Sequence, residues 1–150
     1  MGAVVTVTTR SDGWDIRLMD YVDEVREKAF DWSSFECLRF ANSAAKVQTG
    51  VGFADDWIGG YKCARSALRK YRKKLKADGE QSIVTAIDGR LKRVGGLVPP
   101  RGSIVARRQD DMPVLGYTLG VAIGDLIAFP ALGGLFFDEP KTSDICWSVE

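Results

Sequence analysis

The chain has 150 residues, of which 45% are hydrophobic, 10% aromatic and 27% charged. This composition is typical of a single globular domain over residues 1–150 and argues against a disordered or low-complexity protein. There are 21 Lys and Arg residues and 20 Asp and Glu residues, so the net charge is +1. A molecule this close to neutrality has no strong overall field for nucleic acid or membranes, and any such attraction must be local.

Cysteine and histidine usage restricts the possible chemistry. The chain has three cysteines, Cys37, Cys63 and Cys146, and no histidine. The cysteines are odd in number and lack metal-ligand spacing, and the usual imidazole partners of zinc are missing. We therefore expect no metal, no cofactor and synthesis in a reducing cytoplasm. The first residues lack the basic start and long apolar run of a secretory signal, so we expect no export by that route.

The N-terminal region is expected to form a short strand or arm at residues 1–12, followed by a helix. Val4 to Thr9 alternates apolar and hydroxyl residues, as an edge strand does. From Trp14 to Lys28, the apolar residues Leu18, Val22 and Val25 recur at helical spacing. This pattern predicts a helix that packs on the core with one face.

The segment from Phe30 to Gly50 is the most informative part of the sequence. It predicts a loop followed by a helix, with Ser33 or Ser34 as N-cap and Gly50 as terminator. Cys37 then falls in the first turn, where the helix dipole and free backbone N–H groups lower a thiol pKa. Two interpretations remain open: Cys37 is a mounted nucleophile, or it is a small buried core residue.

A strongly basic, amphipathic helix is predicted from Lys62 to Lys76. Such a helix is a solvated face, a docking surface for another protein, or a site for phosphate backbones or anionic lipid. We favour protein docking over nucleic acid because no base-stacking aromatic and no DNA-reading motif accompany it. In the preceding loop, Asp55 and Asp56 are expected to cap a turn rather than bind metal. The candidate partner-binding residues are Lys62, Arg65, Arg69, Lys70, Arg72, Lys73, Lys74 and Lys76.

After a short helix from Gln81 to Leu91, the sequence changes to β-rich segments separated by Gly, Pro and Asp. Helices followed by consecutive short strands predict an α+β domain with an antiparallel meander. The stretch Val114–Phe137 carries only one charge, Asp125, but Pro130 interrupts it, so we prefer buried strands to a membrane helix. The predicted strands are Ser103–Arg107, Val114–Ile123, Leu126–Phe129, Leu135–Asp138 and Ile145–Val149.

Three short motifs resemble the NlpC-like cysteine peptidases, papain-like enzymes of bacterial cell-wall turnover. The first is the aromatic, Trp, polar loop, acid and Cys pattern of Phe30–Ala41, which continues to Gly50. The second is Pro99–Val105, which resembles the family's strand start with Ser103 where Asp is usual. The third is Leu119–Gly124, which is similar to the strand after the catalytic histidine. The resemblance is closer to a divergent branch encoded among phage tail genes and in gene-transfer agents.

The resemblance implies that Cys37 stands at the nucleophile position, Thr118 near the general-base position and Phe129 near that of its orienting partner. Without histidine the ordinary general base is missing. The resemblance therefore implies a catalytically degenerate, structural component of a phage tail tip or baseplate, located in the virion and bound to other tail-tip or hub proteins. The first alternative is an active cysteine peptidase or amidase on peptidoglycan, with Glu36 as the only nearby candidate base. The second is an electrostatic module for DNA or lipid.

Overall fold

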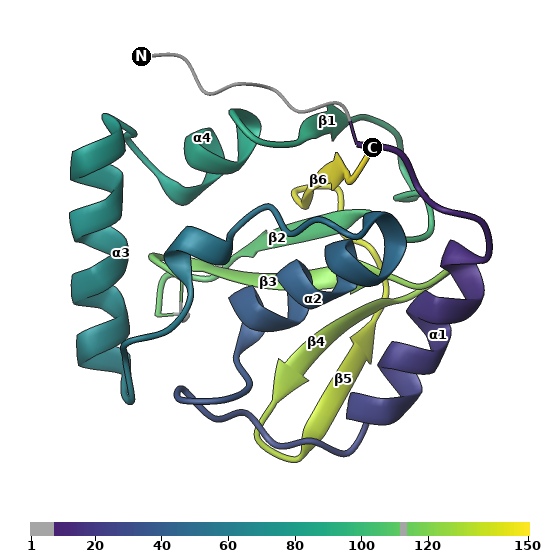
Figure 1. Cartoon of the computed structure of the whole chain (residues 1–150), viewed down its shortest axis with the longest axis horizontal. Helices are drawn as coiled ribbons and strands as arrows, with labels where there is room; N and C mark the ends of the chain where they lie inside the picture. Colours follow the sequence, from purple (N-terminus) through teal and green to yellow (C-terminus); the bar gives the residue numbers. More distant parts are fainter. Residues whose placement is uncertain (1–7, 112–113) are drawn as a thin grey trace.

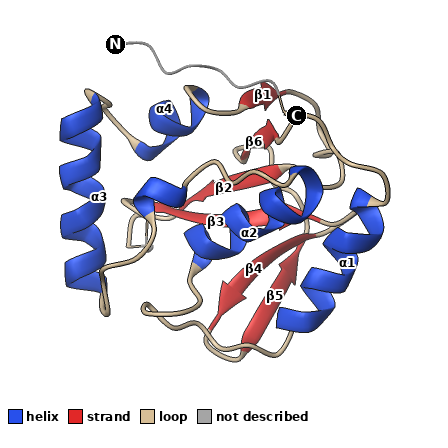
Figure 2. Cartoon of the chain, in the orientation of Figure 1, coloured by secondary structure: helices blue, strands red, loops and turns tan. Residues whose placement is uncertain are grey.

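The computed structural model describes residues 8–111 and 114–150 and has an α+β architecture in which helices precede strands (Figures 1 and 2). The predicted class, with helices first and antiparallel strands after them, is confirmed. The helical elements are α1 (Trp14–Val25), α2 (Cys37–Thr49), the 3-10 turn η1 (Asp55–Trp57), α3 (Ala64–Asp78) and α4 (Ile83–Asp88). The strands are β1 (Lys92–Val94), β2 (Ile104–Arg108), β3 (Tyr117–Ala122), β4 (Ile127–Ala131), β5 (Gly134–Asp138) and β6 (Ile145–Ser148).

The strands form one antiparallel sheet with the order β1-β6-β2-β3-β4-β5. The predicted meander is correct from β2 to β5, where each strand pairs with the next. It is wrong for β6, which crosses back and pairs with both β1 and β2. Strand β1 was not predicted, because its residues are exposed or half-buried and show no apolar alternation. Strand β1 is identified by its antiparallel pairing with β6.

Helix α2 packs against β3 and also contacts α1, and this packing forms the main core (Figure 1). Cys37, Leu38 and Phe40 of α2 are fully buried, as is Leu119 of β3. Helix α1 contributes the predicted face of Leu18, Val22 and Val25. The first turn of α2, which carries Cys37, is therefore fixed from both sides in the centre of the molecule.

Several predicted boundaries differ from the observed ones. The first helix ends at Val25 rather than Lys28, and the helix predicted over Gln81–Leu91 is confined to Ile83–Asp88. Ser82 begins α4 because its side chain accepts a hydrogen bond from the N–H of Thr85. The strand predicted over Val4–Thr9 lies mostly outside the described residues.

The apolar stretch Val114–Phe137 contains β3, β4 and all but the last residue of β5, as the strand interpretation predicts. Its glycines and Pro130 belong to strands and turns, and most of β3 and β4 is buried in the sheet. Across the parts of the chain that the structure describes, no helix is both long and apolar enough to span a membrane.

Candidate functional site

Cys37 is the first residue of α2, and Glu36 is the N-cap. The Glu36 carboxylate accepts hydrogen bonds from the N–H groups of Leu38, at 2.9 Å, and Arg39, at 3.2 Å. The predicted caps Ser33 and Ser34 are therefore wrong. Ser33 instead donates its N–H and its hydroxyl to Oδ1 of Asp31, in a turn that closes before the helix begins.

The Cys37 thiol is sealed inside the protein. Its residue is 0% exposed, and burial raises the pKa of the thiol to about 12, with the neighbouring Glu36 carboxylate acting in the same direction. The prediction that the helix N-terminus lowers the thiol pKa is wrong, because the cost of burying a thiolate outweighs the favourable helix dipole. The core interpretation of Cys37 is the one that the structure supports.

Strand β3 brings Thr118 next to Cys37. The Thr118 side chain and the Leu119 backbone both act to lower the pKa of the Cys37 thiol, against the larger effect of burial. The residues at the nucleophile and general-base positions of the resemblance therefore meet across the α2–β3 contact. Thr118 carries a hydroxyl there and cannot act as the proton acceptor that an imidazole provides.

Phe129 lies in β4, next to β3, but in a different apolar cluster from Cys37. It packs with Val105, Ala122 and Ile127 in a second, smaller apolar cluster, and the Arg107 guanidinium lies 4.8 Å from the centre of its ring. The structure therefore does not bring the residue at the orienting position to Cys37. An aromatic side chain in this packing has no polar group with which to orient a base.

Sequence reasoning missed a buried polar chain beside the thiol. Glu36 is fully buried, and its Oε1 accepts a hydrogen bond of 2.9 Å from the hydroxyl of Tyr61. The Tyr71 hydroxyl donates in turn to that of Tyr61, at 3.1 Å. Burial raises the pKa of Glu36. The only signal in the sequence was the presence of Tyr61 and Tyr71 ten residues apart around the apolar stripe of α3.

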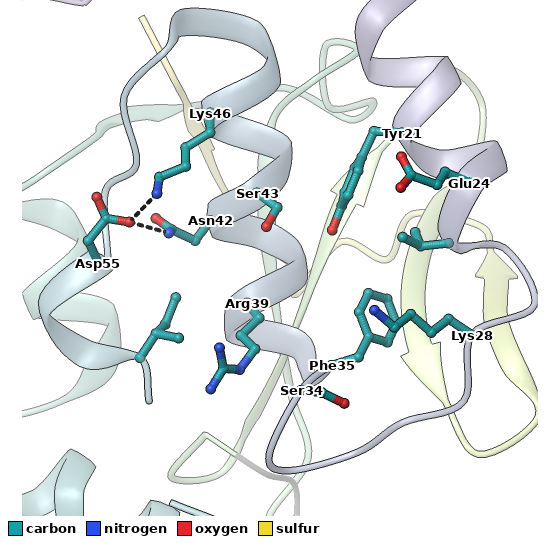
Figure 3. A pocket seen from close by; sticks show the side chains of 12 residues that line it. Tyr21, Glu24, Lys28, Ser34, Phe35, Arg39, Asn42, Ser43, Lys46 and Asp55 are labelled. Atoms are coloured by element: carbon teal, nitrogen blue, oxygen red, sulfur yellow. Dashed lines mark hydrogen bonds and ion pairs between the residues drawn. The ribbon is translucent and has the colours of Figure 1, made fainter. Parts of the chain in front are cut away.

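A surface hollow of about 350 Å³ lies between α1, α2 and the η1 loop (Figure 3). Its lining mixes both signs of charge, with Glu24 and Lys28 on one side and Lys46 and Asp55 on the other. Asp55 is already bound by Lys46 at 2.9 Å and by the Asn42 amide at 2.7 Å. Cys37 does not line this hollow, so the hollow gives a substrate no path to the thiol.

The prediction that Asp55 and Asp56 cap a turn is wrong, because η1 has no side-chain cap and both carboxylates instead bind residues of other elements. Asp56 accepts hydrogen bonds from Arg90, one of them at 2.9 Å, and pairs with Lys74 at 3.0 Å. These partners hold the pKa of Asp56 at about 2. Within residues 8–111 and 114–150, no group of three or more His, Cys, Asp or Glu side chains could hold a metal ion.

The eight basic residues of the predicted docking helix fall into two groups. Lys70 donates to the carbonyls of Ile58 and Gly59, and Lys74 pairs with Asp56, so these two hold α3 to the η1 loop. The other six are exposed, and their side chains make no ion pair or hydrogen bond with any described residue. They are Lys62, Arg65, Arg69, Arg72, Lys73 and Lys76.

Comparison with known proteins identifies a family. The model of a family described as a domain of unknown function, DUF6950, covers residues 9–149 of the chain. No curated protein and no solved structure matches the sequence or the fold. The matched region contains every helix and strand described above. The chain therefore belongs to the DUF6950 family.

Proposed function

We propose that the chain is a catalytically degenerate, NlpC-like scaffold that serves as a structural component of a phage or phage-like tail tip or baseplate. The observation that carries the loss of catalysis is the contact between Cys37 and Thr118. The sulfur at the nucleophile position is buried, and its neighbour on β3 is a hydroxyl in place of an imidazole.

Cysteine catalysis needs a thiolate that a substrate can reach and a base that exchanges its proton. Neither condition holds for Cys37. A thiol with a pKa of about 12 is protonated near neutral pH, and its 0% exposure denies contact with a peptide. Glu36, the substitute base, already accepts hydrogen bonds from the backbone of Leu38 and Arg39 and from Tyr61. Its carboxylate caps the N-terminus of α2.

The tail-tip assignment rests on the resemblance to the phage-borne branch of NlpC-like proteins, and the order of elements agrees with it. A cysteine-bearing helix precedes an antiparallel sheet, and the strand opposite the cysteine is the one that the resemblance selects. A scaffold of this kind contributes surfaces rather than chemistry. Its partners are then other tail-tip or hub proteins, and its location is the virion.

The assignment is tested by the composition of particles. Particles released from cells that carry the encoding phage genome are separated into heads and tails, and the chain is quantified in each fraction by mass spectrometry. We expect it in tails, at a fixed ratio to hub proteins. We also expect Cys37→Ala particles to assemble and infect like the wild type. Absence of the chain from purified tails overturns the assignment.

The peptidase alternative is tested on the purified chain. Wild type and Cys37→Ala are incubated with peptidoglycan under reducing conditions, and released amines are measured; we expect none from either. Iodoacetamide labelling of the native protein should modify exposed Cys63 first, whose pKa is lowered by its hydrogen bond with Ser66. Cys37 should react only after unfolding. Amine release by the wild type alone, or rapid labelling of native Cys37, would favour the peptidase alternative.

A further inference from the structure

The exposed side of α3 carries a row of cations, Lys62, Arg65, Arg69, Arg72, Lys73 and Lys76, here called the basic row. Lys62 lies just before α3, and most of the five members within the helix follow one another at three- and four-residue intervals, so they line one side of it for about 17 Å. Residues 62–76 hold eight of the 21 Lys and Arg residues of the chain and none of its 20 Asp and Glu residues. With a net charge of +1, the remainder of the molecule is therefore negative.

Part of that negative charge lies on α1 and the turn that follows it. The buried residues Leu18, Val22 and Val25 fix which side of α1 faces the core. On the opposite side the chain exposes an acidic face, defined by its four members. Only Asp23 has an ion-pair partner in the described chain, the exposed Arg26 at 3.0 Å. The members are Asp20, Asp23, Glu27 and, at the edge next to the hollow between α1 and α2, Glu24.

The basic row and the acidic face lie at opposite ends of the longest axis of the molecule, with α3 at the left and α1 at the right of Figure 1. They cannot pair within one chain, and each points away from the core on which its helix packs. The residue intervals along the two faces match. Asp20, Asp23 and Glu27 follow intervals of three and four residues, as do Arg69, Arg72 and Lys76.

We propose that the basic row of α3 in one copy of the chain docks on the acidic face of α1 in the next copy. The contact is head-to-tail, because each copy uses a different surface on either side of it. Contacts of this type do not stop at a dimer: they close into a ring or continue as a filament. The chain then assembles with itself through two helices that the core leaves exposed.

Two observations favour a second copy over a nucleic acid as the occupant of the basic row. No aromatic side chain is exposed on α3 for base stacking, since its only aromatic residue, Tyr71, is buried. In addition, the negative remainder of the molecule repels a phosphate backbone but attracts the basic row of another copy.

The contact is expected to be weak and sensitive to salt. Exposed ion pairs contribute little individually, and salt screens them. Two helix faces also bury less area than a stable protein–protein interface requires. Association should therefore need high protein concentration and low salt, and ring closure would strengthen it because each copy is held at two contacts.

Sedimentation velocity of the purified chain tests the proposal. At low salt, raising the protein concentration should produce species larger than dimers, and about 0.5 M salt should return them to monomers. Reversal of either surface, by Arg69→Glu with Arg72→Glu or by Asp20→Lys with Glu27→Lys, should abolish the association. A control with the same charge change as the first variant, Lys92→Glu with Lys141→Glu on exposed sites of β1 and the β5–β6 loop, should still associate.

A mixture of the two charge-reversed variants gives the most specific test of the proposal. Each variant alone places like charges opposite one another at the changed positions, whereas the mixture offers complementary charges at every contact between unlike variants and should recover large species. Circular dichroism verifies that all variants are folded. A wild type that stays monomeric at low salt, a mixture that stays monomeric, or duplex DNA binding in place of self-association overturns the proposal. Since the proposal rests on charge geometry alone, its failure leaves the particle-composition test of the tail role unaffected.

Discussion

The hydroxyl of Tyr61 donates a 2.9 Å hydrogen bond to Oε1 of Glu36, and this bond joins the loop before α3 to the N-terminus of α2. The same carboxylate accepts from two backbone N–H groups of α2, and Nε of Arg39 lies 3.4 Å from it. Every polar group that reaches the buried carboxylate is therefore a donor. The N-terminus of α2 is therefore capped by Glu36, whose two carboxylate oxygens both act as hydrogen-bond acceptors.

Glu36→Gln should lower the free energy of unfolding by about 1–3 kcal/mol, because the new amide NH₂ faces a donor and leaves a buried hydrogen bond unmade. Urea unfolding followed by circular dichroism measures the difference. Tyr71→Phe is the matched control: it removes only the hydroxyl that donates to Tyr61, leaves the bonds to Glu36 in place, and should cost about 1 kcal/mol. Equal stability of Glu36→Gln and the wild type would show that the native carboxyl group carries a proton.

Arg107 should be the most sensitive charged residue of the sheet. Its side chain is 5% exposed, and it makes two hydrogen bonds to Asp144, at 3.0 and 2.9 Å, and one to Asp138 at 2.7 Å. Asp144 is itself 2% exposed, so Arg107→Leu leaves a buried carboxylate without its cation. We expect a loss of about 3–5 kcal/mol in the free energy of unfolding.

The neighbouring pair supplies the control for Arg107. Arg108 lies 3.5 Å from Asp110, and their side chains are 70% and 91% exposed. Arg108→Leu should change the free energy of unfolding by about 0–1 kcal/mol, because water solvates both charges equally well without the pair. Thermal unfolding of the two variants side by side measures the contrast. Similar losses in both would mean that the Arg107 cluster is as open to water as the surface pair.

Short-range sequence patterns correctly predicted the end of α2 and the buried face of α1. The α2 helix begins at Cys37 and ends with Gly50 at φ 82°, the left-handed conformation that glycine adopts readily. The face of α1 followed from the spacing of Leu18, Val22 and Val25. Helical periodicity and a glycine terminator depend on residues close together in the sequence, so both can be predicted without knowledge of the tertiary packing.

The state of the candidate site depends on long-range packing, which a single sequence does not encode locally. Whether Cys37 is a reactive thiol or a core residue is decided by β3, some 80 residues later in the chain, which covers it. Similarly, β6 lies between β1 and β2 because Trp147 is fully buried there and donates its indole N–H to Asp88 at 2.8 Å. The predicted meander lacked this contact and therefore left β6 at the wrong edge.

Acid should weaken the fold partly through Asp56. Hydrogen bonds from Arg90, with a further contribution from Lys74, lower its folded pKa from 3.8 to about 2. The unfolded chain therefore binds this proton at higher pH than the folded one. The stabilising contribution of Asp56 is complete above the unfolded pKa and is lost as the pH falls toward about 2.

Asp56→Asn should accordingly be less stable than the wild type near neutral pH, and the difference should shrink as the pH falls from about 4 to about 2. Urea unfolding at a series of pH values measures it. Asp125→Asn is the control, since this exposed carboxylate has no ion-pair partner in the described chain, and it should change the free energy of unfolding little near neutral pH. A difference for Asp56→Asn that is constant with pH would contradict the assigned ion pair.

Gly120 is required by the approach of β4 to β3. A Cβ atom at this position would lie 2.6 Å from both the Ala128 carbonyl oxygen and the Phe129 ring, closer than packed atoms tolerate. Gly120→Ala should therefore destabilise the fold by about 1–3 kcal/mol through overpacking. Gly133→Ala, in the β4–β5 turn with nothing within 4 Å of the new Cβ, should have little effect. Thermal unfolding distinguishes the two. Equal tolerance would mean that β4 can move away from β3, which a strand paired on both sides cannot do without breaking the meander.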